Sequence, residues 1–142
     1  MADITLPTEI HLDIVTPDRL VAHDAVTAVT IPGKNGALGI LPGHAPLLTE
    51  LASGAMEYTS GTAKHTLCVN WGFAEVLGDR VIVLAQSAER AEEIDVERAE
   101  KAKLRAEDRL KRFDDLQVDR ERARIALIRA MARLETAHKL RG

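Results

Sequence analysis

Cysteine is almost absent from this chain of 142 residues, which contains only Cys68. A disulfide framework and a zinc site built on cysteines are therefore excluded, and Cys68 is interpreted as a small core side chain. Aromatic residues make up only 3% of the chain. The core is therefore expected to be aliphatic, and a platform on which nucleic-acid bases could stack is not expected.

Long apolar runs are missing as well. No stretch approaches the roughly 18 apolar residues of a membrane-spanning helix, and Met1–Ile4 do not open a basic segment followed by an apolar one. We therefore expect a protein of the cytosol that is neither exported nor inserted into a membrane. The composition, 46% hydrophobic and 29% charged, excludes a disordered tail.

Catalytic and metal-binding motifs are also lacking. Lys34 follows Gly33, but a phosphate-binding P-loop would need glycine at position 28 and Ser or Thr at position 35, where the chain has Ala28 and Asn35. The histidines are dispersed without the spacing of metal ligands: His11, His23, His44, His65 and His138. The sequence therefore predicts no catalytic residues and no metal site.

The charged residues divide the chain into two parts. Residues 1–88 carry 4 basic and 9 acidic side chains, whereas residues 89–142 carry 15 basic and 13 acidic ones. A change of this size indicates two different structural units, and we place the domains at 1–88 and 89–142.

The first unit is typical of β structure. Ile10–Ile14 alternates apolar and polar residues, and Leu77–Arg80 is typical of a tight hairpin turn. Further strand-sized runs, separated at short intervals by glycine or proline, are Ala25–Ile31, Ala63–Val69, Phe73–Val76 and Val81–Leu84. Many short strands without a helical period predict a sandwich or flattened barrel.

The second unit predicts an antiparallel two-helix hairpin, which makes the fold class α+β. Asp95 and Asp119 are candidate N-caps of helices that reach Arg112 and about Lys139, and alanines recur every three or four residues. A row of alanines buries little apolar area. At ~25 cal/mol per Å² of apolar area buried, it stabilises the pair of helices only weakly. A spare apolar set on the second helix needs cover from the β domain or another protein: Ile125, Ile128, Met131 and Ala132.

Two arginines of the second helix have no acidic neighbour on that helix. No carboxylate lies three or four residues from Arg129 or Arg133. In an antiparallel hairpin Arg98 comes level with Arg133, and Arg105 with Arg129, so four guanidinium groups are expected on one side, with Asp95 near its end. Such groups suit phosphate oxygens. A phosphate ligand, a protein contact and a solvated surface all remain open.

The segment Gly36–Thr49, GALGILPGHAPLLT, resembles the ε subunit of bacterial and chloroplast F-type ATP synthases, called δ in mitochondria. The order of a β sandwich and a helical hairpin is similar over essentially the whole chain. The resemblance implies a non-catalytic rotor subunit that couples ATP synthesis to proton flow. It also implies a peripheral location at the cytoplasmic face of the cell membrane.

The resemblance further implies the partners. The β domain of this family binds the γ subunit and rests on the ring of c subunits, for which Lys34 and His44 are the candidate contacts. Some relatives have an acidic residue where this chain has Ala37. The hairpin of the family lies folded or extends into the α/β head, where it blocks ATP hydrolysis. The basic residues expected to meet acidic residues of the β subunit there are Arg122, Arg129 and Arg133.

Some members of the family bind ATP through the motif Ile/Leu-Asp-x-x-Arg-Ala, which Ile94–Ala99 matches. The resemblance thus implies a nucleotide site made by Glu89, Asp95, Arg98, Ala99, Arg105, Arg129 and Arg133. Bound ATP would act as a regulatory ligand that holds the hairpin folded. No cofactor is required, and the resemblance does not decide whether Mg²⁺ takes part.

Three hypotheses follow from the sequence. The chain is a rotor subunit that senses ATP, or the same subunit with a hairpin that inhibits without nucleotide and with Asp95 serving only as a cap. The third hypothesis is an unrelated β-sandwich adaptor whose basic hairpin meets an acidic partner or nucleic acid. A pI of 5.9 and the scarcity of aromatic residues argue against nucleic acid.

Overall fold

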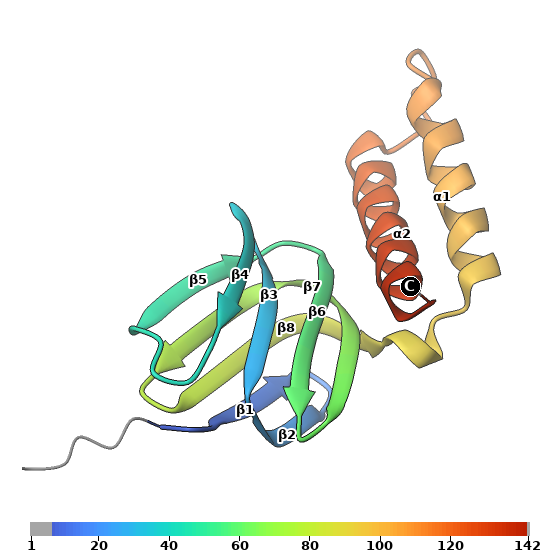
Figure 1. Ribbon diagram of the computed structural model, residues 1–142. Helices are drawn as coiled ribbons and strands as arrows, with labels where there is room; N and C mark the ends of the chain where they lie inside the picture. Colours follow the sequence, from blue (N-terminus) through green and yellow to red (C-terminus); the bar gives the residue numbers. More distant parts are fainter. Residues whose placement is uncertain (1–6, 142) are drawn as a thin grey trace, which may run out of the picture.

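The computed structural model describes residues 7–141, which form a β domain followed by two helices (Figure 1). The strands are β1 (Ile10–Val15), β2 (Leu20–Val26), β3 (Ala28–Gly33), β4 (Gly36–Ile40), β5 (Leu47–Leu51), β6 (Gly54–Ser60), β7 (Ala63–Leu77) and β8 (Arg80–Arg90). A short 3-10 helix, η1 (Ala91–Glu93), then leads into α1 (Val96–Lys111) and α2 (Arg120–Arg141). The predicted order of a β sandwich and a helical hairpin is confirmed.

Strand β7 joins the two halves of the β domain. Residues 63–69 of β7 pair with β6, residues 72–76 pair with β5, and β8 pairs with both parts. Strand β3 in turn pairs with both β5 and β6. The sheet therefore closes through β7, β5, β3 and β6 into the predicted flattened sandwich, and β8, β1 and β2 extend it on the other side.

Two predictions of strand extent are wrong. The runs Ala63–Val69 and Phe73–Val76 are parts of a single strand, β7. The run Ala25–Ile31 is divided, because β2 ends at Val26 and β3 begins at Ala28. Between them, Thr27 N donates to Thr59 O at 2.9 Å. Strand β2 pairs with β1, whereas β3 pairs with β4 and β6, so the chain changes neighbours at Thr27. A strand-sized run of β-branched and small residues in the sequence does not reveal such a change.

The core of the β domain is aliphatic, as expected. Side chains that alternate along the strands, such as Leu12 and Ile14, are fully buried. The buried aromatic residue is Tyr58, whose hydroxyl donates to Asp24 Oδ2 at 3.1 Å. Burial raises the pKa of the Tyr58 hydroxyl above its ordinary value of 10.0, so this group stays a neutral hydrogen-bond donor.

Both predicted N-caps are present. The carboxylate of Asp95 accepts from Arg98 N at 3.1 Å, and that of Asp119 accepts from Arg122 N at 3.0 Å. These bonds satisfy amides that have no partner within the first turn of each helix. The two helices meet along the predicted seam of small side chains, in which the buried residues are Ala99, Ala106, Ala123, Ala130 and Ala137.

Helix α2 lies between α1 and the β domain and contacts β6 and β7 (Figure 1). Ala132 and Ala137 pack there against Cys68 and Ile94. The β domain thus covers one member of the spare apolar set, Ala132, whereas Met131 remains 51% exposed. Within residues 7–141, no helix combines the length and the apolarity that crossing a bilayer requires.

Strand β7 bends sharply where it passes from β6 to β5. Trp71 has a φ of 39° and Gly72 a φ of 147°, both in the region that L side chains rarely adopt. A Cβ atom on Gly72 would lie 1.8 Å from the carbonyl oxygen of Leu84 on β8. Only glycine fits at this position, so the bend is built into the sequence.

We expect Gly72→Ala to lower the free energy of unfolding by about 3 kcal/mol, because the added methyl group collides with backbone and the φ of Gly72 disfavours alanine. Chemical denaturation followed by circular dichroism measures this loss. Gly39→Ala is the matched control, since nothing lies within 4 Å of a Cβ atom there. Equal stability of the two variants would contradict the expectation.

Candidate functional site

A cavity lies where the β domain meets the hairpin. Its volume is about 190 Å³, and it is lined by Glu89, Glu93, Asp95, Arg98, Ala99 and Arg133. Glu89 comes from the end of β8, Asp95 to Ala99 from the start of α1, and Arg133 from α2. Five of the seven residues predicted for a nucleotide site therefore meet here, including the expected pair Arg98 and Arg133.

Arg133, which has no acidic neighbour on its own helix, has an acidic partner from another element. Its Nε donates to Glu89 Oε2 at 2.9 Å, and both side chains are partly exposed. The partner comes from the β domain, so the spacing of residues along α2 does not reveal it. The cavity holds three carboxylates, those of Glu89, Glu93 and Asp95, and two guanidinium groups.

Arg129 is also partnered, but by an aromatic ring. Its guanidinium carbon lies 5.4 Å from the centre of the Trp71 ring on β7, within the range of a cation–π contact. Arg129 and Arg122 line a second cavity of about 430 Å³, with Asp119, Glu121, Ile125 and Ala126. Among the described residues, Arg105 is exposed on α1 and lines neither cavity.

The hairpin is also held to the β domain at the end of α2. Lys139 Nζ lies 3.4 Å from Glu57 Oε1 on β6, and Lys64 Nζ lies 2.6 Å from Glu57 Oε2. The two ammonium groups, Lys64 first, hold the pKa of the Glu57 carboxyl below its ordinary value of 4.5. Burial under α2 raises the pKa of the Cys68 thiol above its ordinary 9.0, so the thiol is neutral.

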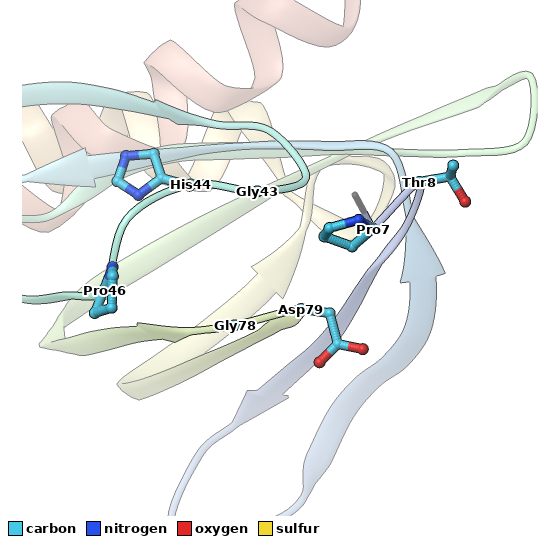
Figure 2. Close-up of a pocket in the computed structure, with 7 residues that line it drawn as sticks. All are labelled: Pro7, Thr8, Gly43, His44, Pro46, Gly78 and Asp79. Atoms are coloured by element: carbon cyan, nitrogen blue, oxygen red, sulfur yellow. The ribbon is translucent and has the colours of Figure 1, made fainter. Parts of the chain in front are cut away.

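Lys34 and His44, the predicted contacts of the c ring, lie on two different turns. Lys34 Nζ is 3.0 Å from Glu50 Oε2 on β5. His44, on the loop between β4 and β5, lines an open cleft of about 600 Å³ with Pro46, Gly78 and Asp79. Figure 2 shows the His44 ring and the Asp79 carboxylate pointing in different directions. Among residues 7–141, no group of three or more potential ligands is placed to hold a metal ion.

Apolar side chains gather on the outer face of β5, β7 and β8. Phe73 and Leu84 are cross-strand neighbours and are 54% and 53% exposed. Leu48 on β5 is 70% exposed and pairs with Glu75, next to them on β7. Exposed apolar side chains on neighbouring strands are typical of a surface that binds another protein.

Sequence reasoning missed two residues of the site region. Glu93 lines the cavity but belongs to η1, just before the motif that drew attention to Asp95 and Arg98. Trp71 contacts Arg129 from a different domain. Residue spacing gave no signal for this contact, because Trp71 lies 58 positions before Arg129 in the chain.

The two parts of the chain match two family models. Residues 9–91 match "ATP synthase, Delta/Epsilon chain, beta-sandwich domain", and residues 92–138 match "ATP synthase, Delta/Epsilon chain, long alpha-helix domain". The chain belongs to the ATP synthase delta/epsilon family. The resemblance of Gly36–Thr49 is thereby confirmed.

Individual members of the delta/epsilon family are similar over most of the chain. The ATP synthase epsilon chain of Koribacter versatilis is 59% identical over 70% of this chain and 70% of its own length. That of Nitratidesulfovibrio vulgaris is 50% identical over 88% and 92%. A chain in the cryo-EM structure of the Euglena gracilis mitochondrial ATP synthase (OSCP/F1/c-ring) is 30% identical over 92% and 82%, with a TM-score of 0.82.

We expect the ion pairs of Glu57 with Lys64 and, to a smaller extent, with Lys139 to make stability depend on pH. The pKa of Glu57 is lowered by folding, so its contribution to stability is complete above its ordinary value of 4.5 and is lost as the pH falls through the lower folded value. Between about pH 5 and pH 3, the free energy of unfolding should fall more steeply in the wild type than in Glu57→Gln.

Denaturant titrations at each pH measure this difference. Glu50→Gln is the control, because Glu50 pairs with Lys34 at a more exposed position, where solvent screens the interaction. Identical pH profiles for the wild type and Glu57→Gln would contradict the expectation.

Proposed function

We propose that this chain is the ε-type subunit of the central stalk of an F-type ATP synthase and performs no chemistry itself. The match of both domains to the delta/epsilon family is the observation that supports this most strongly. In this function the subunit turns with the rotor and couples ATP synthesis to proton flow. It acts as a peripheral subunit at the cytoplasmic face of the cell membrane.

The β domain is proposed to bind the γ subunit through the apolar face of β5, β7 and β8. Leu48, Phe73 and Leu84 project from this face, and burying one such side chain is worth about 1.5–3 kcal/mol. The turns that carry Lys34 and His44 are proposed to rest on the c ring. Their charged and polar tips suit contact with the polar loops of a membrane protein rather than with lipid.

The cavity at the base of the hairpin is proposed to bind ATP as a regulatory ligand. Arg98 and Arg133 project into it from different helices, so a phosphate chain between them would tie the helices together. Arg133 is held by Glu89 at 2.9 Å, so phosphate would have to displace the Glu89 carboxylate. The volume of about 190 Å³ is below the ~300 Å³ usual for a complete ligand pocket, so the cavity would also have to widen.

Widening could recruit the remaining arginines of the predicted site. Arg129 lies one helical turn from Arg133, and Arg105 lies two turns from Arg98. A rotation of the Arg105 and Arg129 side chains toward the phosphates would balance the three carboxylates of the cavity, and it would take Arg129 off the Trp71 ring. Mg²⁺ could provide the same balance.

The hairpin is proposed to inhibit ATP hydrolysis when it leaves the β domain. Extended into the α/β head, α2 would present its exposed basic residues Arg122, Arg129 and Arg133 to acidic residues of the β subunit. ATP bound between the helices would hold the folded form, since a ligand shifts an equilibrium toward the state that it binds better. A fall in ATP would then release the inhibitor.

A second candidate is the same rotor subunit without nucleotide binding, and the charges of the cavity favour it. Glu89, Glu93 and Asp95 oppose a phosphate there, and Asp95 already caps α1. In that case Arg133 and Glu89 form a structural contact between the hairpin and the β domain. Titration with ATP decides between the two candidates.

We expect the isolated chain to bind ATP, in preference to ADP and GTP, with a dissociation constant up to the millimolar range, which is about −4 kcal/mol. Arg98→Ala and Arg133→Ala should each weaken binding at least about tenfold, because a hydrogen bond to a charged group contributes about 1.5–3 kcal/mol. Isothermal titration calorimetry at low salt measures both quantities.

Arg124→Ala is the matched control for these variants. Arg124 is on the same helix and pairs with Glu121 at 3.1 Å, away from the cavity. If the wild type shows no saturable binding at millimolar ATP, or if Arg124→Ala loses as much affinity as Arg133→Ala, the ATP site is refuted and the rotor function remains.

We expect the double variant Phe73→Ser/Leu84→Ser to lose most of its binding to the γ subunit, because both side chains would be buried in that contact. Co-purification of γ with the tagged chain measures the loss. Leu104→Ser is the control, since Leu104 is 64% exposed on α1, away from this face. Full recovery of γ with the double variant would contradict the proposed contact.

A further inference from the structure

Trp71 adopts a backbone conformation that is costly for its type. Its φ of 39° is in the left-handed region, and in residues 7–141 it is the non-glycine residue with a positive φ. A bulky side chain in this region is strained, and such strain persists where the surrounding structure enforces it, often at a functional position. Glycine at position 71 would allow the same bend without this cost.

The strained backbone carries the indole ring to helix α2. Residues 70–72 are where β7 leaves β6 for β5, and Trp71 is outside the paired registers of both. The ring is half-buried, and the Arg129 guanidinium lies 5.4 Å from its centre. A tryptophan face is the best aromatic partner for a guanidinium group. The strained backbone of Trp71 is thus found at a contact between the β domain and the hairpin.

The rest of the contact between the hairpin and the β domain is weak. Its apolar part consists mostly of small side chains, with Ala132 and Ala137 packed on Cys68 and Ile94. Its polar part consists of the partly exposed ion pairs of Arg133 with Glu89 and of Lys139 with Glu57. Exposed ion pairs contribute about 0–1 kcal/mol each, so one cation–π contact of similar size is a large share of the total.

We propose that Trp71 is a positioning residue that holds the hairpin on the β domain by binding the Arg129 guanidinium over its indole ring. The guanidinium and the ring meet directly, with no ligand between them in the proposal, so it goes beyond the proposed ATP site and does not depend on it. It ties Arg129 of α2 to β7, while Glu89 ties Arg133, one helical turn away, to β8. The folded hairpin is then held by both strands that form the bend.

Cys68 provides a direct test, because it is 1% exposed and is covered by α2. A thiol reagent such as N-ethylmaleimide reaches Cys68 only when α2 leaves the sheet. When this opening is fast and rare, the labelling rate is proportional to the open fraction. The experiment uses the full chain without nucleotide and follows the labelled mass over time.

We expect Trp71→Leu and Arg129→Ala each to raise the labelling rate roughly five-fold, which corresponds to the loss of about 1 kcal/mol. The double variant should label no faster than either single variant, because both remove the same contact. Arg124→Ala, which removes an exposed arginine from the same helix, should label at the wild-type rate. Unchanged labelling in Trp71→Leu or Arg129→Ala, or fully additive effects, would overturn the proposal.

Trp71→Gly separates a positioning role from a purely structural one. It removes the ring and also the backbone strain, so the midpoint of chemical denaturation should stay equal or rise while Cys68 labelling still increases about five-fold. If Trp71 only filled space, the denaturation midpoint would fall. That result would overturn the proposal. Because ATP is absent throughout, a failure of ATP binding leaves this test unaffected.

Discussion

The close approach of Gly72 on β7 to the carbonyl group of Leu84 on β8 determines much of this structure. A Cβ atom would lie 1.8 Å from that oxygen, so the paired strands β7 and β8 approach each other there at a distance that only glycine allows. The bend lets one strand of 15 residues pair with β6 before it and with β5 after it, which closes the sandwich. The same bend puts the side chain at position 71 on the side where α2 docks. The core, the apolar face and the hairpin contact thus all follow from one backbone contact.

The hairpin is attached far more weakly than the sandwich is packed. The core of the β domain consists mostly of buried Val, Leu and Ile side chains. The seam between α1 and α2 and the contact of α2 with the sheet consist largely of alanine. Alanine allows close approach but buries little area, so each contact is worth little. A stable β domain with a weakly attached hairpin suits a protein in which the β domain keeps one partner while the hairpin changes partner.

Local features of this fold could be predicted from the sequence, and contacts between distant segments could not. The caps Asp95 and Asp119 and the alanine seam depend on residues three or four apart, so they are visible in the order of residues. The division of Ala25–Ile31 at Thr27 depends on a change of strand neighbours. The glycines of β4, and the exposed residues of both β4 and β5, hide the alternation by which a strand is recognised in a sequence.

For the candidate site, sequence and resemblance together named five of the residues around the cavity but not its charge balance. The partners of Arg129 and Arg133, which are Trp71 and Glu89, lie some 40 to 60 positions earlier in the chain. Helical spacing describes only neighbours on the same helix, so it indicated no partner for either arginine. Their contacts belong to the tertiary structure, and they are what connects the hairpin to the sandwich.

The buried side chain of Ile94 would slow any movement of the hairpin away from the β domain. It stands between η1 and the Asp95 cap, is 9% exposed, and packs with Cys68, so it anchors the hinge itself. If the hairpin left the β domain and exposed Ile94 to water, that exposure would cost about 1.5–3 kcal/mol. A barrier higher by this amount lowers the rate of leaving by roughly one to two orders of magnitude. In the proposed function, a hairpin held in this way would leave the β domain only rarely, so a brief change in its surroundings would not release it.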